Sequence, residues 1–141
     1  MRLKSLVQSY ILSGSSLFAK MNVSFITPTG GQSTKVTPTY GPTITIDCSL
    51  GDNFIIAVSN NTAFTISAPT NAPSTGFTKK ITITIANGSG GAMGAITWNA
   101  AFALAGAFTN PASTKQRSVT FLWSGTGWNE LYRTAADVTT V

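Results

Sequence analysis

The chain has 141 residues, of which 43% are hydrophobic, so it is long enough to form one domain with a buried core. Only 9% of the residues are charged, and nine basic residues outnumber four acidic ones to give a net charge of +5. Histidine is absent and Cys48 is the single cysteine, which excludes an internal disulfide and removes the commonest general base and metal ligand.

The basic residues are scattered along the chain, and no run is longer than the pair Lys79–Lys80. Proteins that bind nucleic acid usually concentrate their positive charge in a stripe, so we expect no nucleic-acid partner and only a mild preference for acidic surfaces. No stretch approaches the roughly 20 apolar residues that cross a bilayer. We therefore expect no membrane partner either.

The first twelve residues have the apolar spacing of an amphipathic helix. Leu3, Leu6, Val7, Tyr10 and Ile11 fall on one stripe, and "SGSS" at 13–16 ends the pattern. A helix this short is marginal alone in water, so the stripe predicts assembly contacts with a partner. "TPTGG" at 27–31 is typical of a linker or turn. We therefore divide the chain into an arm, 1–33, and a second domain, 34–141.

From residue 34 onward the sequence predicts an all-β domain. Short runs rich in β-branched and aromatic residues alternate with Gly, Pro, Asn, Asp and Ser. The eight runs are "STKVTPTY", "PTITIDC", "NFIIAVS", "TAFTISA", "KKITITIAN", "GAITWNA", "RSVTFLW" and "WNELYRT". About eight strands at this spacing favour an antiparallel β-sandwich or a jelly-roll-like barrel. "AAFALAGAF" at 100–108 could be a short helix, but we favour a strand or irregular edge.

The run at 79–87 alternates cleanly, which places Ile81, Ile83 and Ile85 toward a core and the threonines between them outside. "NGSGG" at 87–91 then raises the question of a phosphate-binding loop. It lacks G-x-G-x-x-G and G-K-[ST], and the segment that follows looks like a strand rather than a helix. We therefore interpret it as a turn in a β-hairpin.

The four carboxylates lie in contexts that predict structural roles. Asp47 and Asp52 flank a turn, Glu130 lies three residues before Arg133, and Asp137 lies in the terminal tail. Turn stabilisation and an ion pair or buried polar anchor explain the first three. A polysaccharide-active enzyme would need two of Asp47, Asp52 and Glu130 facing each other across a cleft. With no base for a nucleophile, we expect no catalytic residue, no metal and no cofactor.

The tryptophans are candidates for a binding platform. Aromatic side chains can stack on sugars or bases, although in a sheet protein they more often fill the core. Trp123 alternates with other apolar residues and is predicted to be buried. Trp128 directly follows the turn "SGTG" and is predicted to be partly exposed, on the same face as Glu130 and Tyr132.

The C-terminal half carries a set of motifs that occur together. They are "NGSGG" at 87–91, Trp98, "FTNP" at 108–111, "RSVTF" at 117–121, "GTGWNE" at 125–130 and "RTAADV" at 133–138. This combination resembles a recurring module of tailed-bacteriophage virion proteins, and "TPTYGPTITIDCSLGDNFIIAVSNNTAFTISAP" at 37–69 looks like its upstream part. The resemblance spans residues 36–138. It implies a non-enzymatic β-domain on a virion, within a homo-oligomer that is often a trimer.

A short chain with an arm and one β-domain suits a capsid decoration (cement) protein or a head fibre. The predicted partners are the major capsid protein or other virion proteins, the arm docks on the shell, and the location is the particle surface. The alternative is a tail-associated receptor-binding protein whose loops near Trp128 bind a host glycan.

Overall fold

The computed structural model describes residues 33–140. The predicted arm, including its stripe Leu3, Leu6, Val7, Tyr10 and Ile11, therefore lies outside the described residues apart from Ser33. The described part contains ten strands and no helix, which confirms the all-β prediction. The strands are β1 (Lys35–Val36), β2 (Thr43–Ile44), β3 (Asn53–Val58), β4 (Phe64–Ile66), β5 (Lys80–Asn87), β6 (Ile96–Trp98), β7 (Phe102–Ala103), β8 (Lys115–Trp123), β9 (Trp128–Arg133) and β10 (Val138–Thr139).

Each of the eight predicted runs overlaps one of these strands, and seven contain it entirely; β8 begins two residues before its run. The ambiguous segment 100–108 holds the short strand β7, which confirms the preference for a strand there. The two-residue strand β10 was not predicted, because its residues lie in a tail without an alternating pattern.

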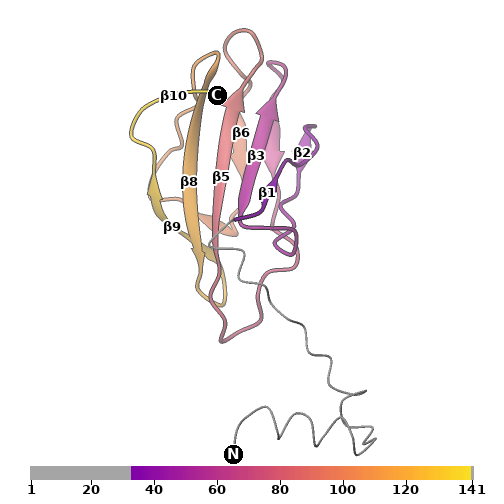
Figure 1. Ribbon diagram of the computed structural model, residues 1–141, viewed down its shortest axis with the longest axis vertical. Coiled ribbons are helices and arrows are strands. Elements are labelled where there is room, and N and C mark those ends of the chain that lie inside the picture. Colours follow the sequence, from indigo (N-terminus) through magenta and orange to yellow (C-terminus); the bar gives the residue numbers. More distant parts are fainter. Residues whose placement is uncertain (1–32, 141) are drawn as a thin grey trace, which may run out of the picture. The chain divides into compact units, whose positions relative to one another are not determined.

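The strands form two sheets. The seven-stranded sheet has the order β1-β3-β5-β8-β9-β7, with β10 paired to β8, and the three-stranded sheet has the order β2-β4-β6. From β1 to β6 the chain alternates between the sheets at every step, and Figure 1 shows β6 behind β5. This is the path of a parallel β-helix with two sheets, followed by the long antiparallel pair β8 and β9.

The prediction of an antiparallel sheet is wrong for five of the eight strand pairings, and the large sheet is mixed. β1, β3 and β5 pair in parallel, as do β2, β4 and β6, and β7 pairs in parallel with β9. The antiparallel pairs are those of β8 with β5, β9 and β10. Parallel neighbours need a crossover connection. From β1 to β6 each crossover contains a strand of the opposite sheet, whereas β7 and β9 are connected through β8 of their own sheet.

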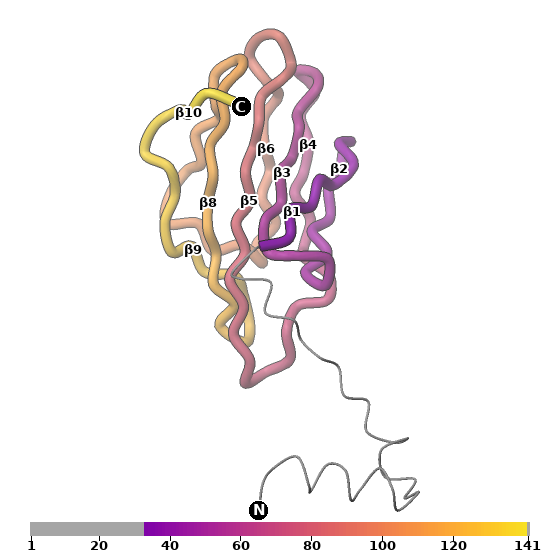
Figure 2. Tube along the Cα trace, viewed as in Figure 1, coloured from indigo at the N-terminus to yellow at the C-terminus, as the bar shows by residue number. Residues whose placement is uncertain are grey.

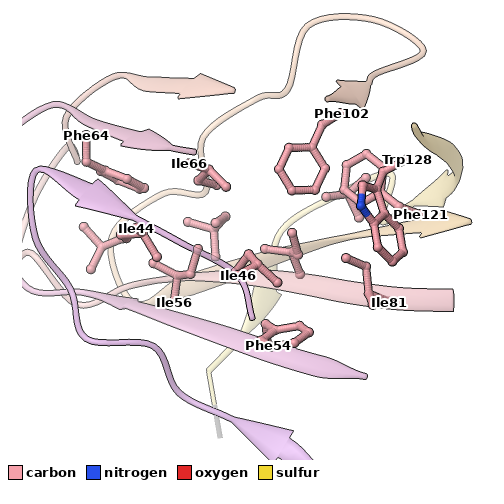
Figure 3. Close-up of a cluster of buried hydrophobic side chains, with 14 of the residues drawn as sticks. Ile44, Ile46, Phe54, Ile56, Phe64, Ile66, Ile81, Phe102, Phe121 and Trp128 are labelled. Atoms are coloured by element: carbon pink, nitrogen blue, oxygen red, sulfur yellow. The ribbon is translucent and has the colours of Figure 1, made fainter. Parts of the chain in front are cut away.

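The core lies between the two sheets and is built from in-register stacks of apolar side chains. Val36, Phe54, Ile83 and Val119 are direct neighbours across four strands of the large sheet. The facing residues Ile44 and Ile66 of the small sheet belong to the same cluster, as Figure 3 shows. Burying one such side chain stabilises the fold by about 1.5–3 kcal/mol, so the cluster is the main source of stability.

The outer face of the large sheet is joined by hydroxyl pairs. The side chains of Thr82 and Thr120 are hydrogen-bonded at 2.9 Å, and those of Thr84 and Ser118 at 2.8 Å. The predicted division of β5, with isoleucines inside and threonines outside, is therefore confirmed. Between the charged Lys80 at one end and Ala86 at the other, this face of β5 therefore carries hydroxyl groups.

Candidate functional site

The glycine-rich loop after β5 is organised by one buried amide. Asn87 is fully buried, and its Nδ2 donates to the carbonyl oxygens of Gly91 and Pro111, both at 3.0 Å. Its Oδ1 accepts from the backbone N–H of Ser89 at 3.0 Å and from the Ser89 hydroxyl at 2.7 Å. The hairpin interpretation is wrong, because residues 88–95 carry the chain from the large sheet to β6 of the small one. The loop leads into a strand, so no helix N-terminus is present to bind a phosphate.

Glu130 and Arg133 form an ion pair that fixes the segment after β7. The guanidinium of Arg133 donates to both carboxylate oxygens of Glu130, and to the carbonyl oxygens of Gly106 and Ala107 at 3.0 and 2.8 Å. Glu130 in turn accepts from the backbone N–H of Ala105 at 2.8 Å. The hydrogen bonds from Arg133 lower the pKa of Glu130, and those to Glu130 raise the pKa of Arg133. The predicted ion pair is confirmed.

A second ion pair anchors the C-terminal tail. The Nε of Arg117 on β8 donates to Oδ1 of Asp137, while Oδ2 of Asp137 accepts from the backbone N–H of Ala112 at 3.0 Å. The hydrogen bond from Arg117 holds the pKa of Asp137 below its ordinary value. The tail and the loop before β8 are therefore held to the same strand.

Asp47 and Asp52 stabilise the connection between β2 and β3. Asp47 accepts from the side chain of Asn71 at 2.8 Å and from Ser49, and the bond from Asn71 is the largest cause of its lowered pKa. Asp52 pairs with Lys79 at 2.9 Å. Between them lies Cys48, whose burial raises the pKa of the thiol to about 11. Cys48 is buried, and a thiol with this pKa stays protonated at neutral pH.

Asp52 and Glu130 are too far apart for a glycosidase pair. Asp52 directly precedes β3 and Glu130 lies on β9, and the pairing register places β5 and β8 between them at the same level. Three strand spacings amount to roughly 14 Å, whereas paired catalytic carboxyl groups lie within about 10 Å. Among residues 33–140 no three Asp, Glu, Cys or His side chains group into a metal-binding cluster.

The predicted exposure of Trp128 is wrong. Its side chain is only 1% exposed, and Figure 3 shows it beside Phe102 and Phe121 in the core. β9 lies between β7 and β8, so Trp128 pairs with Phe102 on one side and with Trp123 on the other. Trp128 is the first residue of β9 and not part of the turn before it. Side chains alternate between the two faces of a strand, and that of Trp128 lies on the face toward the core. A sugar platform cannot be built on a side chain that solvent does not reach.

Five large hydrophobic side chains are exposed in the described part of the chain, and none of the five was predicted as a candidate contact. They are Leu50, Phe77, Leu131, Tyr132 and Val138. Phe77 is the most exposed at 69%, and it lies in the long connection between β4 and β5. The available signal was a lone aromatic residue within the turn-forming segment "APSTGFTKK". These side chains are the candidate contact sites of the domain.

Comparisons of the chain with protein-family models, with curated proteins and with solved structures returned no match. The resemblance to bacteriophage virion modules therefore stays a prediction from the motifs. In the described residues, no helix combines the length and the hydropathy of a membrane span.

Proposed function

We propose that the chain is a non-enzymatic structural protein of a bacteriophage virion, either a capsid decoration protein or a head fibre. Its arm, residues 1–33, docks on the major capsid protein or a neighbouring virion protein. Its sandwich-like two-sheet domain faces outward on the particle surface, as part of a homo-oligomer that the resemblance suggests is a trimer. Binding of this kind stabilises the shell by mass action.

The observation that carries the proposal is that the carboxylates of the domain are bonded to groups of the same chain. Each of the four carboxylates of the sequence accepts a hydrogen bond from the chain or forms an ion pair with it. Asp47, Glu130 and Asp137 hold loops or the tail in place. The sheet surface that remains carries hydroxyl groups, which suit a permanent contact because little charge has to be desolvated. The glycan-binding alternative rested on Trp128, which is buried.

The proposal is tested on virions that encode this chain. Immunogold electron microscopy with an antibody against residues 33–141 should label the capsid surface. Label at the tail would favour the receptor-binding alternative, and unlabelled particles would contradict a virion protein altogether. Particles assembled with a chain that lacks residues 1–20 should carry none of the protein, while the truncated protein still folds. Unchanged occupancy would refute docking through the arm.

A further inference from the structure

The connection between β4 and β5 presents Phe77 on a defined turn. The backbone N–H of Phe77 donates to the carbonyl oxygen of Ser74 at 3.1 Å, and Gly76 has a φ of +95°. This is the hydrogen bond of a β-turn with glycine at the position that requires a positive φ. Figure 2 shows this connection projecting furthest at the lower end of the coloured chain. The turn therefore holds a large aromatic ring in solvent, at 69% exposure.

Two lysines follow Phe77: Lys79 ends the connection, and Lys80 is the first residue of β5. Lys79 pairs with Asp52, while Lys80 is exposed and forms no ion pair with the described residues. Both lysines line an open depression whose other residues are Ser33, Asp52, Asn53 and Thr82. We name Ser33, Asp52, Phe77, Lys79 and Lys80 the entry end, because the arm joins the domain at Ser33. It combines one exposed ring with a net positive charge.

We infer that the entry end is a second docking contact, for an acidic protein surface with an apolar pocket that receives Phe77. This inference rests on the proposed function, because it assigns the partner to the shell that the arm binds. Large aromatic side chains at the centre of an interface often supply most of its affinity, and complementary charge around them speeds association. A contact beside Ser33 acts at high effective concentration once the arm is bound.

The contrast between Phe77 and the other exposed side chains supports this assignment. Leu131 and Tyr132 lie on β9 and have Glu130 and Arg133 as chain neighbours, a pair whose charges neutralise each other. Lys115 lies at the opposite end of the domain, since β8 runs antiparallel to β5 from Gln116 beside Ala86 to Leu122 beside Lys80, and its Nζ donates to the hydroxyl of Thr139 at 2.9 Å. The entry end joins an exposed ring, an unpaired lysine and the attachment point of the arm.

The test uses the full-length chain and shells assembled without it, with binding measured by co-sedimentation. Phe77→Ala and Lys80→Glu are compared with the matched variants Tyr132→Ala and Lys115→Glu. We expect each entry-end variant to bind about tenfold or more weakly and each control to bind like the wild type. Added salt should weaken the wild type more than Lys80→Glu. Because Phe77, Lys80 and Tyr132 are exposed, the thermal midpoints of their variants should match that of the wild type, whereas Lys115→Glu also loses the hydrogen bond to Thr139.

The possible outcomes separate this inference from the proposed function. If the wild type binds the shells and Phe77→Ala and Lys80→Glu bind equally well, the second contact is refuted and docking through the arm stands. Equal losses in all four variants would also refute the assignment to the entry end. If the wild type does not bind the shells, the proposed function and the inference fail together.

Discussion

Single polar side chains decide how the loops of this domain are held. Asn87, Glu130 and Asp137 each bond to a segment distant in the sequence, and each satisfies backbone groups that no sheet ladder reaches. A buried polar group without a partner costs about 1–3 kcal/mol, so these residues are fixed by the groups around them. The carboxylates therefore act as structural ties, as their sequence contexts predicted.

Replacing Asn87 tests the buried amide directly. Asn87→Asp keeps the size of the side chain but places a carboxyl oxygen against the carbonyl groups of Gly91 and Pro111, which lose their donor. We expect the free energy of unfolding to fall by about 2 kcal/mol or more, measured by urea denaturation. Asn61→Asp makes the same change at an exposed position and should leave the midpoint in place. Equal effects of the two changes would contradict a structural role for Asn87.

The ion pair of Glu130 predicts a loss of stability in acid. Its pKa in the folded chain lies below the ordinary value of about 4.3, so its contribution is present above that pH and is lost as the pH falls through the folded pKa. Glu130→Gln should cost about 1–3 kcal/mol at pH 7 and much less at pH 3, measured by denaturation at both pH values. The control Asp52→Asn removes a half-exposed carboxylate and should change little at either pH. A difference between wild type and Glu130→Gln that is constant with pH would exclude the ion pair as its cause.

At the scale of strands, the sequence predicted which residues face the core but not which strands are neighbours. A period of two, as in Ile81, Ile83 and Ile85, is the same in parallel and antiparallel sheets. The direction of pairing depends on where each loop leads, and the loop 88–95 could equally have closed a hairpin. Even the faces of β9 were only partly predictable. A register shift inserts Leu131 and leaves Tyr132 exposed while Glu130 points inward, and such a bulge has no signal in the side-chain pattern.

The connections at the ends of β3 and β5 are packed closely enough to test. A Cβ at Gly94, between β5 and β6, would lie 2.3 Å from the backbone carbonyl of Thr62, between β3 and β4. A Cβ at Gly91 would meet nothing within 4 Å. Gly94→Ala should therefore lower the stability by at least about 2 kcal/mol, and Gly91→Ala should be nearly neutral. Thermal unfolding of the two variants measures the difference. Similar midpoints would mean that the two connections do not pack against each other in this way.

Over the whole molecule, charge is divided unequally between the two parts of the chain. Residues 1–32 contain three basic residues and no acid, whereas residues 33–141 contain six basic residues and all four acids. The arm therefore carries three of the five net positive charges of the sequence. In the described part, sixteen buried hydrophobic residues form a single cluster. We therefore expect the arm to bind an acidic shell, and the core of the two-sheet domain to supply the free energy of folding.

This division predicts that residues 33–141 fold without the arm. About 110 residues can bury enough surface for a stable domain, and the described core is continuous from Val36 to Trp128. The fragment should give a β-type circular dichroism spectrum and one cooperative urea transition, with a midpoint close to that of the full chain. It should fail to bind shells, or bind them only weakly through Phe77, because it lacks the arm. A fragment with no cooperative transition would show that the domain requires residues 1–32 for its stability.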